Sequence, residues 1–157
     1  MSKFIDDLRD EHVRIRDFFS KLEALSSIRD WENRELMYAK LKDVMLPHFQ
    51  AEEEVLFPQV ISSGEMKEKI LYYSEQHSII KRFNDELSDR SKQAHSWQAG
   101  INVLREMVEM HLDKEEADYP AMMESIDPQK AGEVYEKFLQ VEVRFRKQMR
   151  DLKTKPY

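Results

Sequence analysis

Apolar residues recur three and four positions apart along most of the chain, the spacing that places side chains on one face of an α-helix. The first such stretch covers residues 3–25, and the second and third cover residues 30–61 and 65–93. A connection around residues 95–100 is predicted to lead into a fourth helix. Asp127 is a good N-cap residue and Pro128 suits the first helical position, so the two predict a fifth helix after residue 127.

Short connections make consecutive helices antiparallel neighbours. We therefore expect an all-α protein, an up-down-up-down antiparallel four-helix bundle with an additional C-terminal helix. Residues 1–126 would form the bundle, and residues 127–157 would pack on it or form a homodimer contact. Pro47 and Pro58 lie inside the second helix. Proline lacks the amide donor and crowds the carbonyl four residues earlier, so bends are expected near both.

Composition narrows the classes of function. The 157 residues suffice for one domain, and 41% hydrophobic with 36% charged residues suits amphipathic helices. The net charge is −6 and the basic residues are interspersed with acids, so nucleic-acid binding is not expected. No apolar run approaches a membrane span, and early acids argue against a signal peptide, so we expect no membrane association and a cytoplasmic location. The absence of cysteine excludes thiolate ligands, disulfides and cysteine nucleophiles.

One short pattern occurs twice in the chain. His48 is followed four residues later by Glu52, and His111 is followed in the same way by Glu115. A lone histidine lies about 35 residues before each copy, and corresponding positions are offset by 65, 63 and 63 residues. A single His-x3-Glu is weak, because 19 glutamates among 157 residues give roughly 0.6 such pairs by chance. The matched upstream histidines, His12 and His77, make the pattern a duplication of four imidazoles and two carboxylates.

All six residues fall on the apolar stripes of their helices. An unpaired polar group in a core costs ~1–3 kcal/mol, so the six must hydrogen-bond to one another or share metal ions. Counting residues from the predicted turns places them within ~3–8 Å of one depth. We favour the metal interpretation, because the upstream histidines match and all six residues fall on apolar stripes. His48 and Glu52 lie about 40° apart around a helix and can therefore address the same centre.

The donor set divides evenly between two ions. His12 and His48 would bind one ion, His77 and His111 the other, and the two glutamates would be free to bridge both. Imidazole and carboxylate donors without sulfur suit iron, manganese or zinc, and we favour iron or manganese. Open positions would remain for an oxo or hydroxo bridge and for an exogenous ligand.

At these residues the chain resembles the hemerythrin-like, or HHE cation-binding, family over roughly residues 5–125. The likeness lies in His12, His48-x3-Glu52-Glu53 with Leu56-Phe57-Pro58, His77, and His111-x3-Glu115-Glu116 with Tyr119-Pro120. It implies a four-helix bundle around a non-haem di-iron centre that binds O2 or related small ligands. It implies as metal ligands His12, His48, Glu52, His77, His111 and Glu115. The implied cofactor is two iron ions with an oxo or hydroxo bridge, and manganese is the alternative.

The chain departs from the oxygen-carrying members of the family at two positions. They carry His-x3-His on the third helix, whereas Tyr73 stands four residues before His77. They also carry His-x4-Asp on the final helix, where this chain has His111-x3-Glu115. The more symmetric set looks like members linked to iron sensing, iron–sulfur repair, or nitric oxide and peroxide handling. Tyr73 would be a metal ligand, a donor to a ligand or a core tyrosine.

The sequence therefore predicts a non-haem di-iron protein that binds or senses O2, NO or peroxide. The alternative is a metal-responsive regulatory or interaction module, or an iron donor in iron–sulfur repair. A dedicated enzyme is not expected, although oxidase-like or peroxidase-like activity stays open. His95 is expected on the surface. Glu53, Glu54 and Glu116 are expected to be solvated flanks of the motif, and the alternative is that they support the metal ligands. Two methionines lie near enough to line a ligand pocket, Met45 and Met107.

Overall fold

The computed structural model describes residues 2–154, and all regular secondary structure in that range is helical. The helices are α1 (Ser2–Ala24), α2 (Trp31–Ala51), α3 (Phe57–Ile61), α4 (Lys67–Asp89), α5 (His95–Glu124) and α6 (Ala131–Thr154). A 3₁₀ turn, Ile28–Asp30, precedes α2, and a π-helical turn, Glu52–Leu56, joins α2 to α3 in one continuous rod. The predicted all-α class is confirmed.

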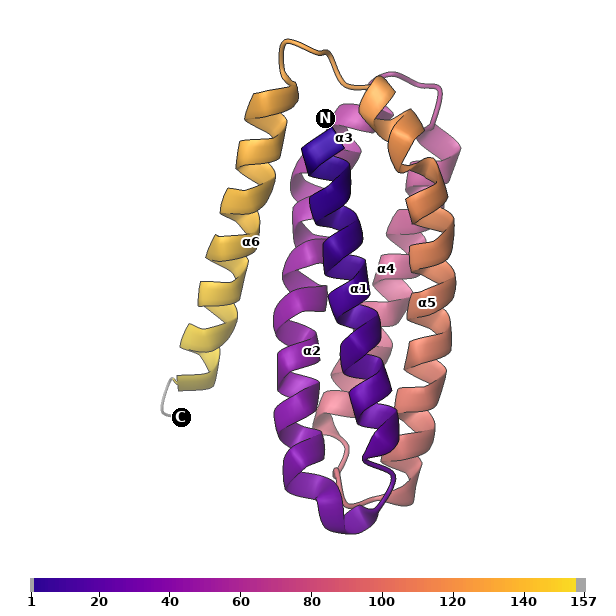
Figure 1. Cartoon of the computed structure of the whole chain (residues 1–157), viewed down its shortest axis with the longest axis vertical. Coiled ribbons are helices and arrows are strands. Elements are labelled where there is room, and N and C mark those ends of the chain that lie inside the picture. Colours follow the sequence, from indigo (N-terminus) through magenta and orange to yellow (C-terminus); the bar gives the residue numbers. More distant parts are fainter. Residues whose placement is uncertain (1, 155–157) are drawn as a thin grey trace.

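Successive helices alternate in direction and pack side by side (Figure 1). Helix α1 packs against α2 and α5, and α4 packs against α5 and α3. These four rods form the predicted up-down-up-down bundle. Helix α6 descends along the outer side of α2 (Figure 1).

A proline in α2 helps to fix the position of α6. Pro47 has no N–H, so the carbonyl of Asp43, four residues earlier, lacks its usual partner in the helix. Arg146 of α6 donates its Nε–H to that carbonyl at 3.0 Å. Phe138 of α6 is also buried, with its ring 5.1 Å from that of Phe4. The homodimer contact through this helix and the division at residue 126 remain predictions.

The predicted connection at residues 95–100 was wrong, because α5 already begins at His95 and the true connection is residues 90–94. Gly100 favoured a loop in the sequence, yet it is buried within the helix. A Cβ atom there would lie 2.3 Å from Cδ2 of Leu87 on α4. Glycine is thus needed for the close approach of α4 and α5 and not for a turn.

The second predicted helix is continuous across both prolines. The α-helix runs without a break through Pro47, and its regular hydrogen bonding changes only at the π-helical turn just before Pro58. The Phe57 N–H bonds to the carbonyl of Glu52, five residues earlier. The wider turn makes room for the proline ring, which would otherwise crowd the carbonyl of Glu54.

Two apolar clusters fill the bundle, one at each end. On α1 the first cluster includes Leu8 and the second begins at Ile15, and His12 lies between them. On α4 the residues Tyr73 and Ile80 flank His77 in the same way. A polar layer therefore crosses the middle of an otherwise apolar core.

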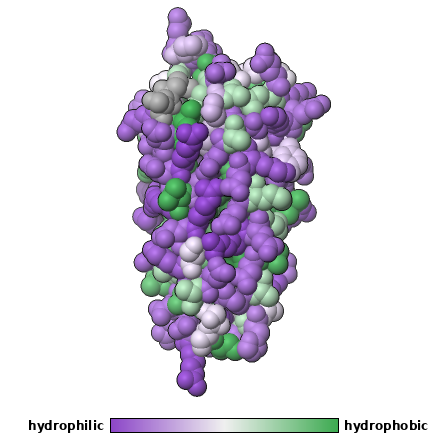
Figure 2. Space-filling view, turned by 45° about the vertical axis from the view of Figure 1, so that its right-hand side comes forward, coloured by the Kyte–Doolittle hydropathy of each residue, from purple (hydrophilic) through white to green (hydrophobic). Residues whose placement is uncertain are grey.

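The surface is predominantly hydrophilic on the face shown in Figure 2, with hydrophobic residues scattered in small groups. Among the described residues, no helix combines the length and apolar character that crossing a bilayer requires.

Candidate metal centre

The structure brings together all six residues of the duplicated pattern, and each is fully buried. One imidazole comes from each of four helices: His12 from α1, His48 from α2, His77 from α4 and His111 from α5. Glu52 opens the π-helical turn and Glu115 lies one turn beyond His111. The depth inferred from residue counting is therefore correct.

The imidazoles form two pairs that meet through their Nε2 atoms. The Nε2 atoms of His12 and His48 are 3.0 Å apart, and those of His77 and His111 are 2.9 Å apart. Donor atoms of Glu52, His77, His111 and Glu115 lie within 4.8 Å of one another, and so do those of His12, His48 and Glu115.

Both glutamates lie between the two pairs. Glu52 Oε1 is 3.2 Å from Nε2 of His48 and 3.6 Å from Nε2 of His77. Glu115 reaches Nε2 of His12 at 3.7 Å with one oxygen and Nε2 of His111 at 3.3 Å with the other. Each carboxylate thus faces both imidazole pairs, which is the arrangement that bridging ligands need.

The outer nitrogen of every imidazole contacts a residue from a neighbouring rod of the bundle, and the four contacts form a closed ring. Glu11 of α1 binds Nδ1 of His48 at 2.9 Å, and Glu53 binds Nδ1 of His77 at 3.2 Å. The ring is completed by two further contacts at 2.7 Å each, from Gln76 of α4 to His111 and from Glu116 of α5 to His12. Glu53 and Glu116 were expected to be solvated flanks, so that expectation was wrong.

These contacts fix the protonation of three imidazoles. An ionised carboxylate only accepts hydrogen bonds, so Nδ1 of His12, His48 and His77 carries the hydrogen. The neutral form of each then has a lone pair on Nε2. His77 can accept a hydrogen from His111 if the Gln76 amide turns its NH2 toward Nδ1 of His111.

The pair of His12 and His48 has no such solution, because two lone pairs face each other at 3.0 Å. A cation must lie between them, and in the metal-free chain it is a proton. Burial acts to lower the pKa of His48, but the carboxylates of Glu52 and Glu11 raise it well above its ordinary value. Burial lowers the pKa of His12, so His48 takes the proton.

The two central carboxylates are also incompletely satisfied. Within the described part of the chain, Glu52 Oε1 and Glu115 Oε2 are buried without a well-directed hydrogen bond. Burial and the neighbouring charge of Glu115 raise the pKa of Glu52 well above its ordinary range. Bound cations would pair with the buried acceptors, separate the facing lone pairs and neutralise the two neighbouring carboxylates. The residues present therefore fit a metal site.

Tyr119 closes the centre on one side, although from the sequence it was known only as part of the family motif. Its fully buried hydroxyl lies 2.6 Å from Glu115 Oε1, 3.0 Å from Glu52 Oε2 and 2.9 Å from His12 Nε2. Burial and the two carboxylates raise the pKa of Tyr119 well above its ordinary value, so the phenol stays protonated. One phenol hydrogen thus faces three acceptors and cannot satisfy all of them at once.

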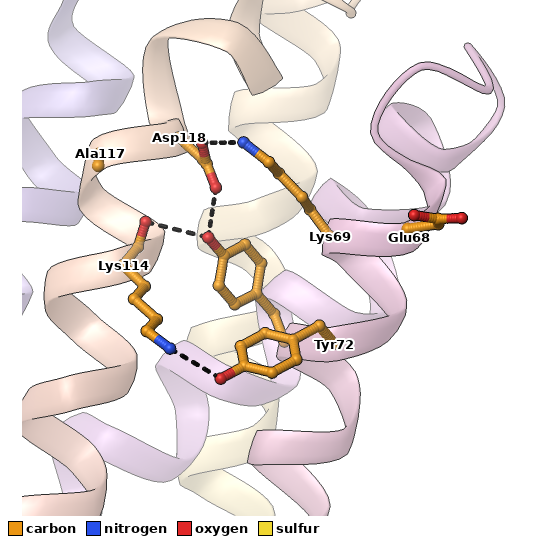
Figure 3. A pocket seen from close by; sticks show the side chains of 7 residues that line it. Glu68, Lys69, Tyr72, Lys114, Ala117 and Asp118 are labelled. Atoms are coloured by element: carbon orange, nitrogen blue, oxygen red, sulfur yellow. Dashed lines mark hydrogen bonds and ion pairs between the residues drawn. The ribbon is translucent and has the colours of Figure 1, made fainter.

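Tyr73 does not point its hydroxyl at this centre. It donates to the carbonyl of Lys114 at 3.0 Å and to the carboxylate of Asp118. Asp118 also pairs with Lys69, and these residues line a surface pocket of about 440 Å³ (Figure 3). Of the three roles considered for Tyr73, the structure favours a core tyrosine. His95 is exposed, as expected.

Helix α6 reaches the centre indirectly. The carboxyl of Glu142, only 5% exposed, lies within 4.8 Å of ligating atoms of Glu11 and His48. Burial and a hydrogen bond with Glu11 raise the pKa of Glu142 to about 9. Glu142 is therefore a neutral acid that donates to Glu11, and the ring of Phe138 lies 6.3 Å from that of His48.

The missed supporting residues had a signal in the sequence. Glu11 and Gln76 each directly precede an upstream histidine, and Glu53 and Glu116 each directly follow a motif glutamate. They occupy corresponding places in the two copies, so the duplication extends beyond the six inner residues.

Comparison with known proteins agrees with the geometry. The family model described as the hemerythrin HHE cation-binding domain matches residues 3–119. No curated protein and no solved structure matches the chain.

Proposed function

The chain belongs to the hemerythrin HHE cation-binding domain family, and from that premise we propose that it holds two iron ions in its buried centre and there binds or senses O2, NO or peroxide. The observation that carries the proposal is the pair of facing Nε2 contacts, 3.0 and 2.9 Å long, with two carboxylates between them. The facing lone pairs of His12 and His48 require a cation, and two bound ions would satisfy both imidazole pairs and both carboxylates at once.

We assign the ligands by the pairs. His12 and His48 would hold one ion, His77 and His111 the other, and Glu52 and Glu115 would bridge them. Nitrogen and oxygen donors of this kind suit iron and also manganese, which remains the alternative metal. When bound, iron would supply an open coordination position and electron exchange with a small ligand.

The protein's own residues orient and enclose the donors. Acceptors on Nδ1 hold each ring in place and direct its Nε2 lone pair inward. The phenol oxygen of Tyr119 lies 2.6 Å from Glu115 Oε1, and its proton can be offered to a group bound between the carboxylates. All six donors are buried between the two apolar clusters, which keeps bulk water out.

Metal analysis is the first test. Aerobically purified protein should contain two irons per chain and show a charge-transfer absorption band. Glu52→Gln should lose iron, whereas the control Glu54→Gln, at an exposed residue two positions away, should retain it. A metal-free chain that is folded and refuses Fe(II) without oxygen would contradict the proposal.

The ligand is tested separately on the loaded protein. Adding O2, NO or peroxide to the reduced form should change the absorption band within the mixing time of a rapid-kinetics instrument. If none of the three ligands changes the spectrum of the iron-loaded protein, the proposed metal site stands and the proposed small-ligand function is wrong.

A metal-responsive interaction module is the second candidate, and one observation favours it. Helix α6 lies outside the matched residues 3–119, yet Phe138 and Glu142 approach His48 and its partner Glu11. Metal occupancy could therefore change how firmly α6 is held. Metal-dependent hydrogen exchange in α6, together with a change of oligomeric state, would support this candidate. A cytoplasmic location and a homodimer through α6 remain predictions.

A further inference from the structure

The ring of supporting residues repeats with the duplication except at one position. Glu53 and Glu116 correspond to each other, but the counterpart of Glu11 is Gln76. Three imidazoles therefore have a carboxylate on Nδ1, and His111 has a neutral amide oxygen at 2.7 Å. The two imidazole pairs look equivalent in their own residues and differ in what stands behind them.

The two pairs differ in the charge that stands behind them. Behind His12 and His48 stand two carboxylates, Glu116 and Glu11, and one cation, Arg16, which lies 3.0 Å from Glu116 and also pairs with the exposed Asp113 at 2.6 Å. Behind the other pair stand one carboxylate, Glu53, and one cation, Lys81, which pairs with it. The first position carries an excess negative charge and the second carries none.

Aromatic rings lie closer to the second pair than to the first. Phe49 stacks on the ring of His77 at 4.2 Å and Phe57 at 5.5 Å, whereas Phe49 and Phe138 meet the ring of His48 edge-on at 5.9 and 6.3 Å. Such apolar neighbours do not stabilise the charge of an ion. The two central carboxylates favour neither pair, since Glu52 Oε1 lies 3.2 Å from His48 Nε2 and 3.6 Å from His77 Nε2. Glu115 lies 3.3 Å from His111 Nε2 and 3.7 Å from His12 Nε2.

We propose that Gln76 makes the two metal positions unequal, so that the position of His77 and His111 fills second and empties first. A carboxylate behind a ligating imidazole makes it a stronger donor, and loss of such a partner typically weakens metal binding ~10–100-fold. Gln76 acts through His111 and is a positioning residue. The inference rests on the proposed two-ion centre.

Isosteric substitutions test it with little risk to the fold. Gln76 is half-buried and lines a surface groove of about 340 Å³, so a glutamate there keeps access to water. The metal-free chain is titrated with Co(II), and in separate runs with Fe(II) under anaerobic conditions, against a competing chelator. The wild type should bind two ions with dissociation constants that differ at least tenfold.

Variants of Gln76 and Glu11 should each change the affinity of a different one of the two metal-binding steps. Gln76→Glu should tighten the weaker step about tenfold or more, and Glu11→Gln should weaken the tighter step by a similar factor. The control Gln140→Glu adds the same charge on an exposed position of α6 and should change neither step. A crystal grown with one equivalent of Co(II) should show anomalous signal between His12 and His48.

Two results overturn the inference in distinguishable ways. Equal affinities in the wild type, or a weaker step that Gln76→Glu leaves unchanged, remove the inference while the two-ion centre stands. Binding of fewer than two ions by the wild type removes the proposed centre together with it. Should Gln76→Glu not fold by circular dichroism, Glu11→Gln alone still decides, because an unaltered tighter step refutes the role of the ring.

Discussion

Removal of the Tyr119 hydroxyl should destabilise the metal-free protein more than the metal-loaded one. In Tyr119→Phe the ring still fills its buried place, so the loss is confined to one donor. That donor lies 2.6 Å from a carboxylate oxygen of Glu115, and hydrogen bonds to charged groups are worth ~1.5–3 kcal/mol. We therefore expect a loss of about 2 kcal/mol, or about 4–8 °C in Tm for a chain of this size.

Metal should reduce this loss to below about 1 kcal/mol, because bound ions satisfy the same carboxylates. Urea unfolding followed by circular dichroism, with chelator and then with iron, measures both values. The control Tyr72→Phe removes a hydroxyl that contacts Lys114 Nζ at the surface and should change stability little in either state. Equal losses with and without metal, or no loss without it, would refute the description of Tyr119 as the donor to the empty centre's acceptors.

Three further outcomes are expected. Glu142→Gln should flatten the pH dependence of stability, because the stabilisation by the protonated acid is complete below its unfolded pKa and is lost as the pH rises through about 9. Urea midpoints at pH 5 and 9 measure this, and an unchanged difference between them would contradict it. Gly100→Ala should lower Tm by overpacking against Leu87, at ~1–3 kcal/mol, whereas Gly132→Ala, which meets open space, should not lower it. The buried Arg34 of α2 donates hydrogen bonds to the carbonyls of Leu25 and Lys92 in two connections. Arg34→Met should therefore cost ~2–3 kcal/mol of stability and speed hydrogen exchange in both connections, and unchanged exchange would contradict this.

The fold and the inner site could be predicted because both follow from periodicity within single helices. His12 and His77 stood on apolar stripes, and the repeated spacing of His48 and Glu52 marked them as a set. Burial of all six confirms that they belong to the core; their role as ligands remains a proposal.

The supporting residues could not be predicted from the stripes, because each acts on a neighbouring helix. Glu11 adjoins His12 in sequence but contacts His48, since adjacent residues point about 100° apart on a helix. Gln76 serves His111 in the same way. The start of α5 was missed for a similar reason, because Gly100 is explained by Leu87 on another helix.

The π-helical turn at Glu52–Leu56 sets the angle at which the second half of this rod faces the core. Its hydrogen bond spans five residues, so the chain holds one residue more than an α-helical path would need. If all its residues followed an ordinary α-helical path, everything after the turn would rotate by about 100° around the helix axis. Phe57 would then leave His77, and the two halves of the rod would no longer serve one core. The π-helical turn is therefore what absorbs the extra residue between Glu52 and Phe57, and a relative that lacks this residue could keep the same core with an ordinary α-helical turn.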